Sequence, residues 1–282
     1  MKRKSFGATG IELPAIGQGT WNMPQSGAGR KEAVRALRRG IELGMTHLDT
    51  AEMYGAGAVE ELLGEAIGGI GRERLFIASK VLPENATYAG TLEAARRSIA
   101  RLGCDYLDLY LLHWPGSHPL EETMRGLEDL VEQGTVRFVG VSNFDTGEML
   151  EAASYLRNVP LACNQVLYHL TERGIEHRLI EAARERNIAI VAYTPFGRGA
   201  FLREPSQLQA LAAIAKKHGA TPRQVALAFL TREPNLFAIP KAASVAHVQE
   251  NAKAASLTLD QEDLATIDRA FARGHPGPLA TL

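Results

Sequence analysis

Four side chains that can hold or move a proton follow apolar stretches of this chain. MTHLD ends in Asp49, RLFIAS is followed by Lys80, and YLDLYLLH ends in His113. Tyr54 follows Asp49 by five residues. If the stretches are adjacent parallel strands, Asp49 and Lys80 lie close enough to form an ion pair, which offsets much of the free-energy cost of burying either charge alone.

Tyr54 would lie in the loop or first helical turn after Asp49, where its hydroxyl can lean over the ion pair. A free tyrosine has a pKa of about 10, which is too high for an efficient proton donor at neutral pH. We expect the Lys80 ammonium to lower the pKa of Tyr54, and His113 to orient a substrate oxygen. Two chemistries remain open: proton donation during carbonyl reduction, and a Schiff base on Lys80.

The same residues also have ordinary structural explanations. A strand-end aspartate or lysine is commonly a structural ion pair, and a tyrosine after a strand commonly packs in the core. Their joint occurrence at the ends of consecutive strands favours a site. His47 is instead expected to be a core residue whose ring is satisfied by the backbone.

Neither the cysteines nor the histidines have a spacing that is typical of a metal site. Cys104 and Cys163 are the only cysteines, and the eight histidines are scattered. We therefore expect two free thiols and no metal.

The proposed site needs elements that bring these residues together, and the chain shows a regular series of them. Eight short apolar runs alternate with helical patterns, which predicts a parallel sheet of the α/β class, closed as a (β/α)8 TIM barrel. The opening KSFGATGIELPAIG is predicted to form a β-hairpin that closes the bottom. No linker divides residues 1–282, so we expect a single domain. The runs are AIGQG, MTHLD, RLFIAS, YLDLYLLH, VRFVGVS, ACNQVLY, IAIVAY and LFAIP.

Helix signals fill the intervals between these runs. RKEAVRALRRGIELG carries apolar residues at helical spacing and stops at Gly44. TPRQVALAFL begins with a capping box of Thr221 and Gln224, with Pro222 at the first helical position. QLQALAAIAKKHG before it predicts an additional helix, and we expect two helices beyond the eight of a simple barrel.

Composition narrows the class of protein. The net charge is −1, with 45% hydrophobic and 22% charged residues, as in an ordinary globular protein. This balance favours neither nucleic acid nor a membrane surface as a partner, and no stretch approaches membrane-spanning length. We expect a cytoplasmic protein.

The last strand offers a site for an anion. GAGAVE has a glutamate, Glu60, where the third glycine of a dinucleotide-binding GxGxxG would stand, so a Rossmann domain is not supported. Lys241, by contrast, ends the last apolar run, and Ser244, His247 and Asn251 then recur at helical spacing. A helix N-terminus beside a lysine is suited to bind phosphate.

A series of short motifs runs along nearly the whole chain: GQGTW at 17–21, LDTAEMYG at 48–55, SK at 79–80, LLHWP at 111–115, GVSNF at 140–144, NQV at 164–166, YTPFGRG at 193–199, IPKAAS at 239–244 and EN at 250–251. These motifs, in this order, resemble those of the aldo-keto reductases, most closely the bacterial reductases of methylglyoxal and other small aldehydes. The resemblance implies a barrel that binds a nicotinamide cofactor across its mouth and transfers hydride to a carbonyl.

The resemblance also implies a role for each matching position. Tyr54 would be the general acid, Lys80 and Asp49 its tuning pair, and His113 the orienting donor. The substrate pocket would be walled by Trp21, Tyr54, Leu82, His113 and Trp114. The cofactor would be bound by Gly19, Thr20, Trp21, Asp49, Ser142, Asn143, Gln165, Tyr193, Thr194, Pro195, Phe196, Lys241, Ala242, Ser244, His247, Glu250 and Asn251.

Two departures from the family pattern bear on cofactor and substrate. Many members have serine and arginine where this chain has Ala242 and His247, and a guanidinium suits a phosphate better than a neutral imidazole. NADP(H) is favoured and NAD(H) stays open. The tail after the last helix is short, which predicts a shallow, open pocket for small aldehydes.

The function expected from these observations is NADPH-dependent reduction of small aldehydes or 2-oxoaldehydes by a monomer or weak oligomer. Two alternatives remain at this point. One is a non-catalytic redox sensor or regulatory subunit that binds NADPH on the same fold. The other is a lyase that forms a Schiff base through Lys80.

Overall fold

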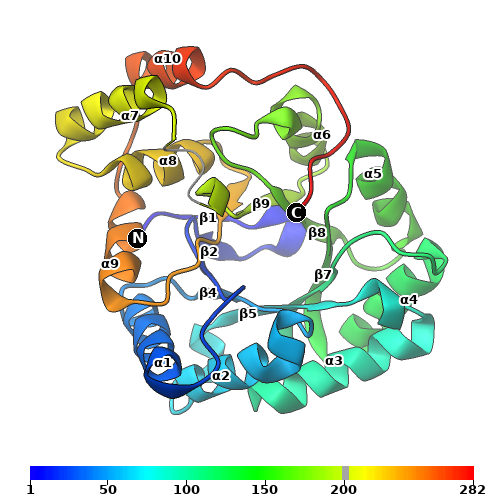
Figure 1. Cartoon of the computed structure of the whole chain (residues 1–282). Coiled ribbons are helices and arrows are strands. Elements are labelled where there is room, and N and C mark those ends of the chain that lie inside the picture. The colour runs from blue at the N-terminus through cyan, green and yellow to red at the C-terminus, as the bar shows by residue number, and fades with distance from the viewer. Residues whose placement is uncertain (199–202) are drawn as a thin grey trace.

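Eight parallel strands form the centre of the protein (Figure 1). The computed structural model describes residues 1–198 and 203–282. Each strand pairs with its neighbour in sequence, and every strand corresponds to one of the eight predicted apolar runs. The strands are β3 (Gln18–Gly19), β4 (His47–Asp49), β5 (Phe76–Val81), β6 (Leu107–Leu112), β7 (Val136–Ser142), β8 (Leu161–Leu167), β9 (Ala189–Tyr193) and β10 (Leu236–Ala238).

The first and last strands meet and close the sheet into a barrel. Parallel bridges join Ile16 to Ala238 and Gly19 to Lys241. The backbone N–H of Gly17 donates to the carbonyl of Ala238 at 2.8 Å. Glycine is required at position 19, because a Cβ there would lie 2.5 Å from the carbonyl oxygen of Ile239. The predicted (β/α)8 barrel is confirmed.

Helices surround the barrel, and over the described residues there are two more than the eight that a simple barrel needs, as predicted (Figure 1). The predicted capping box of Thr221 and Gln224 is formed at the start of α8. The helices are α1 (Gly27–Glu42), α2 (Ala58–Ile67), α3 (Tyr88–Leu102), α4 (Leu120–Glu132), α5 (Thr146–Tyr155), α6 (Leu179–Glu185), α7 (Pro205–His218), α8 (Pro222–Leu230), α9 (Val245–Ala254) and α10 (Gln261–Ala270). Short 3-10 turns are η1 (Gly7–Thr9), η2 (Tyr54–Gly57), η3 (Arg72–Arg74), η4 (Pro83–Asn85) and η5 (Gly174–His177).

An N-terminal hairpin closes the bottom of the barrel, as the sequence predicts. Strands β1 (Arg3–Ser5) and β2 (Glu12–Pro14) pair in antiparallel register. Phe6, which follows β1, is fully buried and packs edge-on against Phe76 and Phe237 from inside the barrel. The interior is therefore a packed core below the site rather than a channel.

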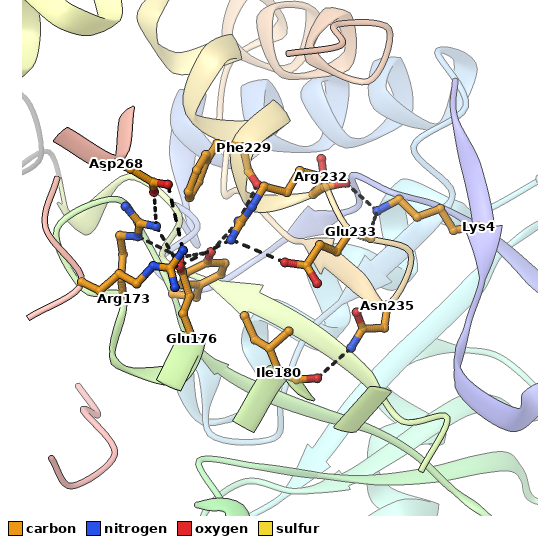
Figure 2. Close-up of polar contacts among 12 residues, drawn as sticks. Lys4, Arg173, Glu176, Ile180, Phe229, Arg232, Glu233, Asn235 and Asp268 are labelled. Atoms are coloured by element: carbon orange, nitrogen blue, oxygen red, sulfur yellow. Dashed lines mark hydrogen bonds and ion pairs between the residues drawn. The ribbon is translucent and has the colours of Figure 1, made fainter. Parts of the chain in front are cut away.

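Two buried basic side chains, Lys4 and Arg173, fasten this end of the molecule (Figure 2), and burial lowers the pKa of Lys4 to about 7. The Nζ atom of Lys4 in β1 donates to the backbone carbonyls of Thr231, Glu233 and Leu236 at 2.6–2.7 Å, which ties the hairpin to the segment between α8 and β10. A second group of charges surrounds Arg173, which is almost fully buried. Its guanidinium bonds Glu176, Asp268 and the carbonyl of Phe271, and so fixes the start of the C-terminal tail.

The C-terminal tail crosses the top of the barrel. Helix α10 ends at Ala270, and residues 271–282 run past α6 and α5 until the chain ends over the barrel centre (Figure 1). Within the described parts of the chain, no helix is both long and apolar enough to cross a membrane.

Candidate active site

Asp49 and Lys80 form the predicted ion pair at the upper ends of β4 and β5. Lys80 Nζ lies 2.7 Å from Asp49 Oδ1, and both side chains are almost completely buried. Gln165 from β8 donates to the other carboxylate oxygen, Asp49 Oδ2, at 2.7 Å. Lys80 also donates to the carbonyl of Thr50 at 2.8 Å. Burial alone would lower the pKa of Lys80, but Asp49 and Tyr54 raise it by more, so the lysine stays charged.

Tyr54 leans over this pair from the 3-10 turn η2. Lys80 Nζ donates to its hydroxyl oxygen at 3.3 Å, and the tyrosine is 9% exposed. Lys80 lowers the pKa of Tyr54, as predicted, but the net pKa of the tyrosine lies above its ordinary value. Burial raises that pKa by more than the Lys80 ammonium lowers it. Tyr54 therefore keeps its proton at neutral pH.

His113 lies beside Tyr54, with ring centroids 5.8 Å apart. Burial, followed by the charge of Lys80, lowers the pKa of His113 to about 2. The ring is therefore neutral at physiological pH and can donate one hydrogen bond. Its buried Nδ1 finds no hydrogen-bond partner among the described residues.

His47 is a core residue, as predicted, but its expected backbone partners are missing. The ring packs edge-on against Phe6 and Phe76. Neither ring nitrogen has a hydrogen-bond partner in the described part of the chain. Aromatic packing takes the place of the expected backbone contacts, and burial lowers the pKa of His47 to about 4.

A cavity of about 170 Å³ opens above these residues. Apolar residues that the sequence did not point to, Met53 and Ile239, also line it, as do Arg198 and Leu282. Leu82 is absent from this lining, and its backbone N–H donates to Glu52 Oε1 at 2.8 Å instead. The predicted residues that line the cavity are Gly19, Trp21, Asp49, Tyr54, His113, Trp114, Ser142, Asn143, Gln165, Tyr193, Thr194 and Lys241.

The C-terminal tail reaches the mouth of this cavity. Leu282 is 60% exposed, yet it lines the cavity together with Tyr193, because the tail folds back over the barrel mouth. The length of the tail was apparent in the sequence, but its path depends on contacts such as that of Arg173 with Phe271. Arg198 lies over the ring of Trp21, 4.7 Å from its centroid, at the same mouth.

Polar side chains on one wall of the cavity are linked to one another. Tyr193 donates from its hydroxyl to Asn143 Oδ1 at 2.6 Å, and Asn143 Nδ2 donates to the carbonyl of His113 at 3.0 Å. Ser142 donates to the backbone carbonyl of Gln165 at 2.8 Å. Burial raises the pKa of Tyr193 to about 12, so it stays a neutral ring. This wall presents amide and hydroxyl groups beside an aromatic face.

The remaining predicted cofactor residues do not line the cavity. Thr20 is buried and donates to the carbonyl of Asp49 at 2.9 Å. Pro195 is buried, and Phe196 lies 5.3 Å from the guanidinium of Arg223. Gly199, the last residue of the YTPFGRG motif, is outside the described residues.

The far end of this surface is the start of α9. Ser244 caps the helix by accepting from the backbone N–H of His247, and Lys241 and His247 are exposed there. Glu32 from α1 accepts from the Val245 N–H at 3.3 Å, so a carboxylate already lies at the helix N-terminus.

Three of the predicted residues at this end face inward or pair with other elements. Glu250 accepts a hydrogen bond from Thr221 Oγ1 at 2.7 Å. Ala242 and Asn251 are buried.

Comparisons of sequence and of structure with known proteins both identify one family. Residues 15–272 match the model of the aldo/keto reductase family. The chain is 44% identical to methylglyoxal reductase YeaE of Escherichia coli strain K12, over 96% of each protein. It is 34% identical to glyoxal reductase of Bacillus subtilis strain 168, over 95% of this chain and 93% of that protein.

A solved structure that resembles the whole chain has ligands bound. It is the crystal structure of an aldo/keto reductase from Klebsiella pneumoniae in complex with NADP and acetate. That protein is 40% identical, each chain is covered in full, and the TM-score is 0.92.

Proposed function

The chain belongs to the aldo/keto reductase family, and from this we propose that it reduces small aldehydes and 2-oxoaldehydes such as methylglyoxal with NADPH. The observation that carries the proposal is the contact of the Tyr54 hydroxyl with Lys80, and of Lys80 with Asp49, at the floor of a small cavity. The relatives named for methylglyoxal and glyoxal reduction support the substrate class. Residues 1–282 would act as one barrel domain.

Proton transfer is assigned to Tyr54. Its hydroxyl is protonated at neutral pH, and it faces the cavity in which a carbonyl oxygen can accept the proton. As that proton leaves, the Lys80 ammonium 3.3 Å away stabilises the developing phenolate charge. Asp49 holds Lys80 in place and keeps it charged. The neutral ring of His113 donates a hydrogen bond to the same carbonyl oxygen and fixes its direction.

The cavity wall fits a nicotinamide. NADPH bound there would supply the hydride to the carbonyl carbon. Ser142, Asn143 and Gln165 offer the hydroxyl and amide groups that a carboxamide requires, and Tyr193 offers an aromatic face. Lys241 and Ser244 lie at the start of α9, where they can contact a phosphate of the cofactor. NADP and NADPH are the ligands named for two structures of the family that match the chain in full.

The geometry speaks against a Schiff base on Lys80. A Schiff base requires a neutral, accessible amine. Lys80 is fully buried, its Nζ bonds Asp49 and the carbonyl of Thr50, and its pKa is raised. A reductase uses the lysine as it is placed here, whereas a lyase would have to break these contacts.

A substrate panel tests the proposal. The purified chain is mixed with methylglyoxal, glyoxal, simple aldehydes and ketones, and the loss of reduced-nicotinamide absorbance is followed with NADPH and with NADH. We expect the highest kcat/KM for small aldehydes with NADPH. Tight NADPH binding without turnover of any carbonyl would instead favour the sensor alternative.

A further inference from the structure

The backbone that carries Tyr54 is in an unusual conformation. Gly55, Ala56 and Gly57, which directly follow Tyr54, all have positive φ angles of 58°, 53° and 96°. For alanine this left-handed region is unfavourable, so contacts from elsewhere must hold the turn in place. Helix α2 begins immediately afterwards, at Ala58.

Glu60, in the first turn of α2, is the residue best placed to supply such contacts. Its side chain is fully buried. Ser79 Oγ donates to Glu60 Oε1 at 2.6 Å, and Arg101 Nε lies 2.6 Å from Glu60 Oε2. Ser79 directly precedes Lys80 in β5, so Glu60 connects the segment of Tyr54 to the strand of Lys80.

Arg101 adds a second contact to the same turn. It extends from α3, and its side chain packs on the backbone of Gly57 so closely that a Cβ at Gly57 would lie 2.6 Å from Arg101 Cδ. The Glu60 carboxylate thus holds the guanidinium against the left-handed turn while it also bonds β5.

On the other side of Tyr54, Glu52 makes a related connection. Its Oε1 accepts from the Leu82 N–H at 2.8 Å and from Asn85 Nδ2 at 2.9 Å. The chain around Tyr54 is therefore tied to the segment around Lys80 both before and after the tyrosine.

We propose that Glu60 is a positioning residue for the reaction, which sets the distance between the Tyr54 hydroxyl and Lys80 through Ser79 and Arg101. It touches neither substrate nor cofactor. The inference rests on the proposed function, because it assigns Tyr54 as the proton donor. It predicts that loss of the Glu60 charge affects proton transfer more than ligand binding.

The test is Glu60→Gln, which keeps the shape of the side chain and weakens its pairing with Arg101. We expect kcat for methylglyoxal to fall about tenfold to a hundredfold, the range typical of a displacement of about 1 Å at a reacting group. The Kd of NADPH should stay within about twofold, because α2 does not line the proposed cofactor surface. Lys80 lowers the pKa of Tyr54, so a displaced Tyr54 should keep its proton to higher pH, and the alkaline limb of the reduction rate should move upward.

A second readout does not depend on turnover. The ionisation of Tyr54 is followed by phenolate absorbance, as the difference between each protein and its Tyr54→Phe counterpart. In Glu60→Gln the pKa of Tyr54 should be higher than in the wild type. Failure of the proposed function would appear as an inactive wild type, whereas failure of this inference would appear as an unchanged Tyr54 titration.

Asp108→Asn is the matched control. Asp108 is also a fully buried carboxylate that pairs with two arginines, Arg72 and Arg137, and accepts from the Ile77 N–H at 2.9 Å, away from Tyr54. This variant should lose stability without a shift in the Tyr54 titration. The same shift in both variants, or no shift in Glu60→Gln, overturns the proposal.

If Glu60→Gln does not fold, Ser79→Ala serves as a second variant, because it removes one of the two contacts of Glu60. The pKa of Tyr54 should then rise by less than in Glu60→Gln. A wild-type titration of Tyr54 in Ser79→Ala would equally overturn the proposal.

Discussion

Asp49 has both carboxylate oxygens engaged, one by Lys80 and one by Gln165. At the scale of single residues this arrangement holds a charged lysine next to a protonated tyrosine. Burial and the ammonium act on the pKa of Tyr54 in opposite directions, and burial is the larger effect. The lysine therefore serves to stabilise the charge that forms when the proton leaves, rather than to make Tyr54 acidic beforehand.

The outer end of the cofactor surface allows a prediction about a single residue. His247 is exposed at the start of α9. If it meets a 2′-phosphate, His247→Arg should lower the Kd of NADPH about tenfold, in the range of one additional charge-assisted hydrogen bond, and leave that of NADH nearly unchanged. Titration of the apoenzyme with each nucleotide measures both constants. Equal effects on the two nucleotides would place His247 away from the phosphate.

At the scale of elements, the sequence was a good guide wherever the pattern is local. Eight apolar runs became eight strands, and the residues at their upper ends came together, because parallel strands of a barrel end at the same rim. Met53 and Ile239 were missed because an apolar residue beside a strand end looks like core. Leu282 and Glu60 were missed because their contacts join segments that are far apart in the sequence. The net pKa of Tyr54 could not be foreseen, since it depends on burial.

The contacts of Lys4 should hold the N-terminal hairpin against the barrel. Lys4→Met should lower the free energy of unfolding by about 3 kcal/mol, because three backbone carbonyls, two of them in fully buried contacts, lose their donor. Lys2→Met, at an exposed neighbouring position, is the control and should change stability by less than about 0.5 kcal/mol. Urea unfolding at neutral pH measures both. Equal losses in the two variants would mean that the contacts of Lys4 do not fasten the hairpin.

At the scale of the whole molecule, the buried histidines couple the fold to pH. His113 has a folded pKa of about 2 and His47 of about 4, whereas an unfolded histidine titrates at about 6.5. Below pH 6.5 both histidines are protonated in the unfolded chain but stay neutral in the folded chain until the pH approaches their lower folded pKa values. Stability should therefore fall as the pH drops from about 6.5 toward 4, by up to about 1.4 kcal/mol per pH unit for each histidine.

Urea unfolding at a series of pH values between 7.5 and 4.5 tests this prediction (~3 pH units, enough to span the unfolded pKa). In His47→Leu the fall in stability should be shallower, because unfolding no longer lets His47 take up a proton. His275→Gln, which changes an exposed histidine of the tail, should leave the slope as it is. A slope that His47→Leu does not alter would show that His47 ionises similarly in both states.

Tyr54→Phe is the decisive test of whether Tyr54 donates the proton in NADPH-dependent reduction of a small aldehyde. The variant keeps the aromatic ring beside His113 and removes only the hydroxyl that contacts Lys80. We predict that kcat for methylglyoxal falls by a factor of about 10² or more while the Kd of NADPH stays within about twofold of the wild type. Wild-type turnover by this variant would show that Tyr54 is not the proton donor.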